Sequence, residues 1–175
     1  MTELFRLRNF AATDAQSIAQ NANHFEIWKG VRDIFPFPYT LSDAESFIAY
    51  ANSTLTERIF AIEVDGSAVG AIGLHFKNDI YRYCGEVGYW IGPNFKGRGI
   101  TTGAVGQIVS MAFKDYNLLR LYAEVFENNI ASARVLEKNG FSLEAKFNSA
   151  IYKDNCVQNL LVFSKTNPTW EPKNL

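Results

Sequence analysis

Residues 85–116 combine an apolar run, a glycine-rich loop and a helical pattern, in that order. The apolar run 87–91 predicts a strand that ends at Gly92-Pro93. The glycines that follow lead into apolar residues at helical spacing: Val105, Ile108, Val109, Ala112, Phe113 and Tyr116. A helix start after such a loop presents unpaired backbone N–H groups at the positive end of the helix dipole. The segment therefore predicts a site for a phosphate or pyrophosphate.

Two common phosphate-binding patterns fit this loop poorly. A P-loop requires a lysine directly after its second glycine, and no lysine stands in that arrangement here. The spacing of Gly97, Gly99 and Gly103 is one residue longer than a dinucleotide fingerprint, with Glu127 after the next strand. Five residues separate Ile91 from Gly97, whereas that fingerprint follows its strand directly. A nicotinamide dinucleotide is therefore the least favoured ligand that we consider.

Length and charge limit the other possibilities. The chain has 175 residues, of which 47% are hydrophobic, which suits one domain with a substantial core. A net charge of −1 gives no overall attraction for nucleic acid or for an anionic membrane. Neither a signal peptide nor a membrane-spanning run is recognisable, so we expect a cytoplasmic protein.

The cysteines and histidines show no metal-binding pattern. Cys84 and Cys156 lack motif spacing, and we interpret both as buried or incidental thiols without a disulfide. His24 and His75 have no neighbouring ligand at metal-binding spacing. We therefore expect no metal cofactor.

The rest of the chain predicts alternating strands and helices. Helices are expected after Thr13 or Asp14, at a capping box formed by Ser42 and Glu45, and from Asn129 or Ser132 to Gly140. Asp65-Gly66 is a strong hairpin signal. Strands are expected near residues 4–8, 58–64, 69–76, 81–91, 119–126, 141–147 and 160–163. The sum is an α+β fold: a mixed, largely antiparallel sheet with helices on both faces and one parallel pair.

Three sequence blocks resemble one known family. Lys96-Gly-Arg-Gly-Ile-Thr101 resembles the Q/R-x-x-G-x-G/A pyrophosphate loop of the GNAT N-acetyltransferases, which use acetyl-CoA. Together with Glu86-Val-Gly-Tyr-Trp-Ile and the block 129–141, it resembles the RimJ/RimL-type branch. The resemblance implies the GNAT fold in a single domain over residues 1–165, with 166–175 as a C-terminal tail.

The resemblance also implies where acetyl-CoA, the cosubstrate, would bind. The amides between Gly97 and Thr102 would hold the pyrophosphate, although Thr101 stands where the family has Gly or Ala. Opening of the ladder at Gly92-Pro93 would free the backbone of residues 89–91 for the pantetheine arm. The expected cofactor-binding residues are Tyr89, Trp90, Ile91, Lys96, Gly97, Arg98, Gly99, Ile100, Thr101, Thr102, Asn129 and Ser132.

Catalytic roles follow less directly. The resemblance assigns Ser132 to protonating the departing thiolate, although Asn129 and Ser132 could equally be ordinary helix-start residues. Many GNAT enzymes carry a tyrosine four positions later, where this chain has Leu136. The glutamate base of RimL-type enzymes falls near Ile151, which cannot accept a proton. Glu86 corresponds roughly to the strand glutamate of some histone-type members, and this resemblance makes it our first choice as base, acting through a water. Glu127 and Glu144 are the reserves.

The acceptor is expected to be an amine. Lysine amines are about 2.6 pKa units more basic than α-amines, so a weak base favours a protein N-terminus or a small molecule with a low-pKa amine. The aromatic segment 24–40 is either a loop pinned to the core or, as the resemblance implies, part of the acceptor wall. A non-catalytic acyl-CoA sensor is the alternative function. Monomer and homodimer both remain open, with Phe35 and Phe37 suited to a dimer contact.

Overall fold

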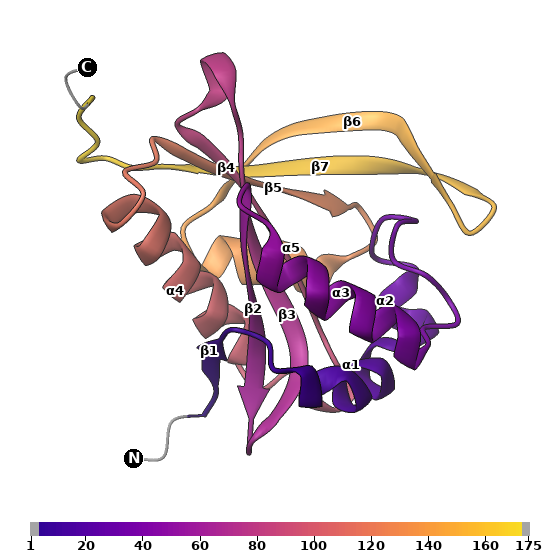
Figure 1. Ribbon diagram of the computed structural model, residues 1–175. Coiled ribbons are helices and arrows are strands. Elements are labelled where there is room, and N and C mark those ends of the chain that lie inside the picture. Colours follow the sequence, from indigo (N-terminus) through magenta and orange to yellow (C-terminus); the bar gives the residue numbers. More distant parts are fainter. Residues whose placement is uncertain (1–3, 173–175) are drawn as a thin grey trace.

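One seven-stranded sheet organises the protein, shown in Figure 1 as a computed structural model that describes residues 4–172. The strand order is β1-β2-β3-β4-β5-β7-β6. The strands are β1 Arg6–Arg8, β2 Glu57–Val64, β3 Ser67–Phe76, β4 Cys84–Ile91, β5 Arg120–Phe126, β6 Ser142–Lys153 and β7 Cys156–Thr166. The helices are α1 Ala15–Ala22, α2 Phe25–Trp28, α3 Leu41–Ser53, α4 Ile100–Lys114 and α5 Ile130–Lys138, with short 3-10 turns at Ala12–Asp14, Asp79–Tyr81 and Pro93–Phe95.

Neighbouring strands pair antiparallel except for β4 and β5, which are parallel. This exception follows from the strand–helix–strand unit β4–α4–β5, because a helical crossover returns the chain in the same direction. The predicted α+β sheet, largely antiparallel with one parallel pair, is confirmed.

The hairpin of β2 and β3 is buried on both faces. Its turn residues Asp65 and Gly66 have φ values of 49° and 82°, as the predicted Asp-Gly turn requires. One face contributes Ile62, Ile72 and Leu74 to the core beneath α4. The other face contributes small residues such as Ala61, Ala68 and Ala71 to a second core. Because both faces are covered, β3 is buried without a break from Ala68 to Leu74 rather than at alternate positions.

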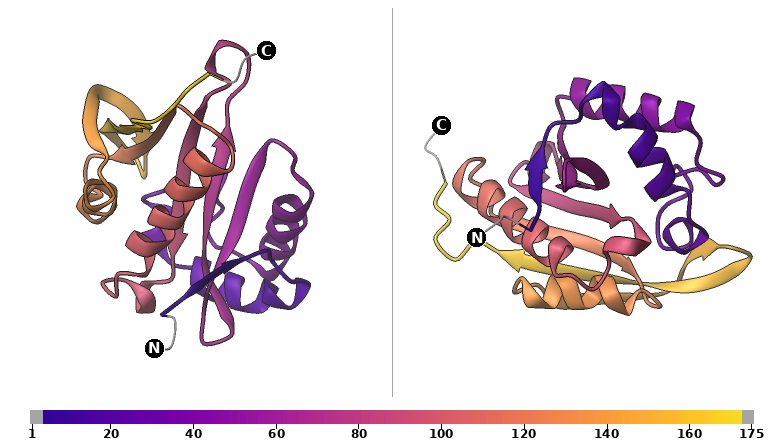
Figure 2. Two further views of the ribbon diagram at one scale, coloured as in Figure 1. Left: turned by 90° about the vertical axis from the view of Figure 1, so that its left-hand side faces the viewer. Right: turned by 90° about the horizontal axis from the view of Figure 1, so that it is seen from below.

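Helices cover the two faces separately. Figure 2 shows α1 and α3 on one side of the strands and α4 and α5 on the other. α1 packs through Ile18 and Ala22, and α3 through Ala44 and Ile48. The prediction of a capping box at Ser42 and Glu45 is wrong by two residues. The cap is Thr40, whose hydroxyl accepts the Asp43 N–H at 3.2 Å while the Asp43 carboxylate accepts the Thr40 N–H at 2.7 Å.

The β6–β7 hairpin extends away from the rest of the sheet in Figure 1. Its turn at Asp154 and Asn155 has φ values of 52° and 56°. After β7 ends at Thr166, the Trp170 indole N–H donates to the Asn117 carbonyl at 3.0 Å. Residues 173–175 of the predicted tail lie outside the described residues.

A buried ion pair fixes the chain between β1 and α1. Asp14 is 5% exposed and accepts two hydrogen bonds from the Arg8 guanidinium, at 2.6 and 2.8 Å, and one from the Ala11 N–H at 2.8 Å. The Arg8 hydrogen bond holds the pKa of Asp14 below its ordinary value of 3.8, although burial acts in the opposite direction. The stabilisation is therefore present at neutral pH and is lost as the pH falls through this lowered value.

We expect Asp14→Asn to lower the free energy of unfolding by about 2 kcal/mol at pH 7, because Arg8 keeps its ion pair with Glu63 but loses the buried charged partner at Asp14. The deficit should shrink as the pH falls from 3.8 through the lowered pKa of folded Asp14, below which the wild-type carboxyl is also neutral. Urea unfolding at pH 7 and in this acidic range measures the deficit. Asp65→Asn, in the exposed β2–β3 turn, is the matched control. A deficit of equal size at both pH values would contradict this account.

Candidate functional site

Strands β4 and β5 run together at one end and then separate. Their pairs extend from Cys84–Arg120 to Glu86–Tyr122, and within the described residues no later pair joins them. β4 stays paired with β3 as far as Ile91, while β5 continues beside β7. The ladder thus opens at Glu86 and not at Gly92-Pro93 as the sequence predicted, because β5 leaves β4 to follow β7.

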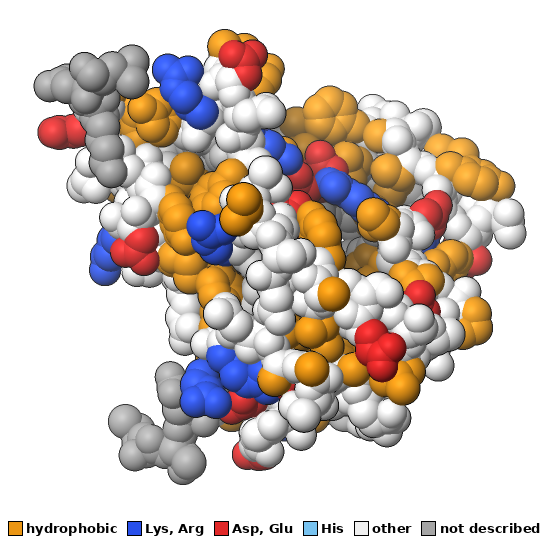
Figure 3. All heavy atoms as spheres, viewed as in Figure 1, with side chains coloured by type: hydrophobic (Ala, Val, Ile, Leu, Met, Phe, Trp, Pro, Cys, Tyr) orange, Lys and Arg blue, Asp and Glu red, His pale blue; other side chains and the backbone are white. Residues whose placement is uncertain are grey.

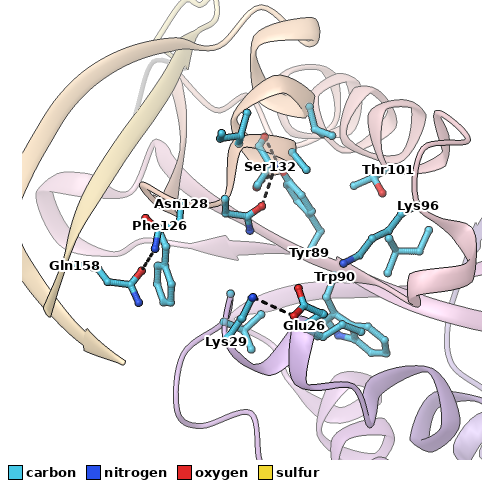
Figure 4. Close-up of a pocket in the computed structure, with 18 of the residues that line it drawn as sticks. Glu26, Lys29, Tyr89, Trp90, Lys96, Thr101, Phe126, Asn128, Ser132 and Gln158 are labelled. Carbon is cyan, nitrogen blue, oxygen red and sulfur yellow. Dashed lines mark hydrogen bonds and ion pairs between the residues drawn. The ribbon is translucent and has the colours of Figure 1, made fainter. Parts of the chain in front are cut away.

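The opening between the strands is a cavity of about 640 Å³. Figure 4 shows β4 side chains, the start of α5 and the residues around α2 converging on it. Of the expected site residues, the cavity wall includes Tyr89, Trp90, Ile91, Lys96, Gly97, Thr101, Asn129 and Ser132. The structure therefore brings together side chains from β4, from the glycine loop and from α5.

The glycine loop leaves the start of α4 uncovered. Gly97 and Gly99 have φ values of 75° and 79°, and Gly99 is the N-cap residue. A glycine N-cap has no side chain to bind the first N–H groups of the helix, which lie at the positive end of its dipole. A Cβ at either glycine would meet nothing within 4 Å, so the space above the loop is open. This geometry suits a phosphate group, with Lys96 alongside.

Four expected cofactor residues are absent from the cavity wall. Gly99 caps the helix and Ile100 is buried in the core. Arg98 stacks on the Phe95 ring at 5.6 Å, and the Thr102 carbonyl accepts from the Asn139 side chain at 3.1 Å. For these residues only the backbone, or a charge near the cleft, remains available to a ligand.

Tyr89 reaches from β4 to the first turn of α5. Its hydroxyl lies 2.9 Å from Ser132 Oγ and 3.2 Å from the Ser132 carbonyl oxygen. Figure 4 shows the two side chains pointing toward each other in the cavity. Burial raises the pKa of Tyr89 to about 12, against the opposing effect of the Ser132 hydrogen bond. The phenol is therefore protonated at neutral pH.

Asn129 begins α5 and orients its first turn. Its side-chain oxygen accepts the Ser132 N–H at 3.1 Å, so it does act as a helix cap. Its amide nitrogen faces Gly30, where an added Cβ would lie 3.3 Å away. Leu136, one turn further along α5, is fully buried in the core beneath α4. A tyrosine at that position in this backbone would meet the core and not the cavity.

Glu86 lies where the two strands separate and is not part of the cavity wall. It binds Lys77 Nζ at 2.8 Å and the Tyr122 hydroxyl at 3.3 Å, and it forms an ion pair with Arg32. Arg32 also binds Glu124 at 3.0 Å. Burial alone would raise the pKa of Glu86, but the Lys77 hydrogen bond and the Arg32 charge outweigh it and lower the pKa. Glu86 is thus ionised at neutral pH and is a weak base.

The two reserve carboxylates are bound by other side chains. Glu127 pairs with Lys146 and accepts from Asn159 at 2.7 Å. Glu144 pairs with Arg120. Neither contributes to the cavity wall.

The aromatic segment does not form the wall with its rings. Phe25, Trp28 and Phe37 stack on one another, and Phe35 packs between Tyr39 and Trp90. The cavity is instead lined by the residues between those rings: Glu26, Ile27, Lys29, Gly30 and Val31. The segment therefore contributes to the site, but through charged, aliphatic and glycine residues that the sequence analysis did not single out.

The β6–β7 turn is the part of the site that sequence reasoning missed. Asp154, Cys156 and Gln158 line the cavity. Of the two interpretations of Cys156, buried or incidental, the structure excludes the buried one, because Cys156 is exposed. Next to them, Lys153 is buried, lies 3.8 Å from the centre of the Trp28 ring and binds Asp33 at 2.6 Å. The Asp-Asn turn was readable in the sequence. Its return to the α2 segment, more than 100 residues away, was not.

Neither a cluster of metal ligands nor a membrane-spanning helix is seen among residues 4–172. No group of three or more potential metal-ligating side chains occurs there. No described helix has the length and apolar character needed to cross a bilayer. On the face shown in Figure 3, basic and acidic side chains are interspersed.

Known proteins with similar sequences or folds are acetyltransferases. The family model described as an acetyltransferase (GNAT) domain matches residues 5–142. The putative ribosomal N-acetyltransferase YdaF of Bacillus subtilis is 34% identical over 107 residues, which cover 61% of this chain and 58% of YdaF. The uncharacterized N-acetyltransferase YnaD of the same organism is 29% identical over 158 residues, or 88% of each chain.

The fold matches solved structures over almost its whole length. The ribosomal-protein-S5-alanine acetyltransferase of Vibrio fischeri superimposes with a TM-score of 0.82, covering 98% of both chains at 22% identity. At this identity the likeness establishes the fold alone.

We expect Gly99→Ala to weaken CoA binding about tenfold. Gly99 has φ 79°, a conformation that alanine disfavours, so the start of α4 must shift. Calorimetric titration with CoA measures this change. Gly66→Ala is the matched control, because Gly66 has φ 82°, an equally open surrounding and a place in the distant β2–β3 turn. Equal loss of affinity in both variants would mean that strain alone, and not the loop, is responsible.

Proposed function

The chain belongs to the GNAT acetyltransferase family and is an acetyl-CoA-dependent N-acetyltransferase, and we propose that its acceptor is an α-amine at a protein N-terminus or a small molecule with a comparably acidic amine. The observation that carries this proposal is the state of Glu86, a carboxylate held by Lys77 and Arg32 with a lowered pKa. A base of this strength favours an amine of low pKa, because a larger fraction of such an amine is already neutral.

We propose that the cosubstrate lies along the cavity, from the glycine loop to the start of α5. It supplies the activated acetyl group. The uncovered N–H groups of α4 and the Lys96 ammonium would bind its pyrophosphate, and the free edge of β4 at residues 89–91 would align its pantetheine arm. Ser132 and Asn129, from the opposite wall, would contact its reactive end.

Ser132 is the proposed proton donor to the leaving sulfur. It lines the cavity at the first turn of α5, and the Asn129 cap holds its backbone in place. Because Leu136 is fully buried, α5 offers no phenol one turn later for this task. The start of α5 would thus direct the serine hydroxyl of Ser132, and not a tyrosine hydroxyl from position 136, at the proposed position of the thioester.

Glu86 is the proposed proton acceptor, through a water. It belongs to the last pair between β4 and β5, where the strands begin to separate, and lies outside the cavity wall. Direct contact with the amine is not required, because one water can carry the proton. The Arg32 and Lys77 charges keep the carboxylate ionised but reduce its basicity.

An α-amine should be acetylated much faster than a lysine amine at pH 7. Neutralising lysine costs roughly 3.5 kcal/mol more than neutralising an α-amine, which corresponds to a rate difference of about 10² to 10³. Release of free CoA thiol, measured with peptides that carry only one type of amine, tests this. The gap should narrow as the pH approaches about 10. Comparable rates at pH 7, or faster turnover of a polyamine, would contradict the proposed acceptor.

Glu86→Gln should lower kcat by about 10² without a similar change in KM for acetyl-CoA, because the amide cannot accept the proton. Glu124→Gln is the matched control, since Glu124 also binds Arg32 and should leave kcat nearly unchanged. The pKa of Glu86 lies below its ordinary value of 4.5, so the increase of kcat/KM with pH above 6 should follow the acceptor amine. Equal losses in the two variants would assign the effect to Arg32 and not to a base.

A further inference from the structure

The hydroxyl pair of Tyr89 and Ser132 joins the two walls of the cleft. Tyr89 comes from β4, which stays in the sheet with β3, and Ser132 comes from α5. Their hydroxyl oxygens lie 2.9 Å apart, a normal distance for an O–H···O hydrogen bond. Because both residues line the cavity, the pair lies beside the space proposed for the thioester.

The hydrogen bonds around Ser132 determine what its hydroxyl proton can do. The Ser132 N–H is already bound to Asn129, so the backbone of this turn is fixed. A hydroxyl has one proton and two acceptor positions. If Tyr89 donates to Ser132 Oγ, the serine proton remains free to point into the cavity. If the serine donates to Tyr89, its proton is occupied and Tyr89 binds the Ser132 carbonyl at 3.2 Å instead.

The chemistry of the phenol favours the first arrangement. The side chain is largely buried, and burial raises the pKa of Tyr89 to about 12, so the phenol keeps its proton throughout the physiological range. A phenol is a stronger hydrogen-bond donor than an aliphatic hydroxyl, because its proton is more acidic. A developing negative charge on Ser132 Oγ would strengthen this bond further.

We propose that Tyr89 is a positioning residue that donates a hydrogen bond to Ser132 Oγ and thereby aims the serine proton at the leaving sulfur. This inference rests on the role proposed above for Ser132. It gives the Tyr89 side chain a role separate from the backbone contacts expected along β4. In this chain the phenol then acts from the strand, while position 136 of α5 is occupied by a core leucine.

In the proposed step, the amine nitrogen forms a bond to the acetyl carbon, and the carbon–sulfur bond breaks with its electron pair moving to sulfur. Sulfur takes the Ser132 proton, and Ser132 regains a proton from solvent. The surplus amine proton passes through water to Glu86. Tyr89 keeps its own proton throughout and stabilises the serine oxygen while that oxygen is short of a proton.

The test compares two acetyl donors that differ only in the leaving atom: acetyl-CoA and the selenoester of the same coenzyme. A selenol is far more acidic than a thiol, so its anion leaves without needing a proton. Tyr89→Phe should lower kcat for the thioester about 10- to 100-fold, as the loss of an orienting hydrogen bond does elsewhere. For the selenoester it should have little effect. A structural defect would slow both donors equally.

Two further variants complete the test. Ser132→Ala should show the same dependence on the leaving atom, and the double variant should be no slower than Ser132→Ala alone, because the two hydroxyls act as a unit. Tyr116→Phe is the matched control. It removes a phenol oxygen that accepts a hydrogen bond from Arg58 at 2.9 Å and that does not line the cavity, so kcat should stay unchanged.

The outcomes separate this inference from the proposed function. The role of Tyr89 would be overturned by any of three results. These are an equal loss of kcat with both acetyl donors, a double variant whose loss of kcat is the product of the two single losses, and a Tyr89→Phe enzyme that is faster than wild type. All three would leave acetyl transfer itself intact. Failure of the wild-type protein to release CoA with any amine would overturn the proposed function and this role together.

Discussion

The separation of β4 from β5 after Glu86 is the feature on which the site depends. Up to that point the two strands are paired, and beyond it β4 keeps only its bonds to β3 while β5 follows β7. The separation creates a free strand edge, a cavity between the strands and a common wall for α4 and α5. Because backbone groups at such an edge must find partners, a ligand with amide groups of its own can align there.

The charges around this opening are arranged in two groups. The uncovered start of α4, with Lys96 beside it, is positive and suits the phosphate end of a cofactor. Where the strands separate, Glu86 is surrounded by Lys77 and Arg32, so its negative charge is compensated. Arg32 follows α2, and its ion pairs tie the α2 segment to β4 and β5. The α2 side of the cleft is therefore held to the sheet by the same ions that lower the pKa of Glu86.

Local patterns were sufficient for most of the fold. The Asp65-Gly66 turn, the glycine loop before α4 and Gly140 after α5 each require a positive φ, and each was located from the sequence. The helix caps were less certain, because Thr40 and Ser42 are both suitable caps and only the path of the chain selects between them. The site was predicted in part: β4, the glycine loop and the start of α5 carry recognisable motifs. The α2 segment carries none, and the Asp-Asn pair between β6 and β7 indicates a turn but not where the hairpin lies in the fold.

The sequence by itself determined the order of strands and helices, the loop that can bind a phosphate and the membership in the acetyltransferase family. The elements and the loop follow from hydrophobic periodicity and from glycines at fixed positions, which act over a few residues. The family follows from the resemblance of three sequence blocks and from the family model that matches residues 5–142. Tertiary structure alone decided where the ladder opens, which cations surround Glu86 and that Tyr89 meets Ser132. The β4–β5 pairs, the Arg32–Glu86 ion pair and the Tyr89–Ser132 contact join residues 36 or more positions apart, and Lys77 meets Glu86 only because β3 and β4 pair. Such contacts depend on how whole strands and helices pack.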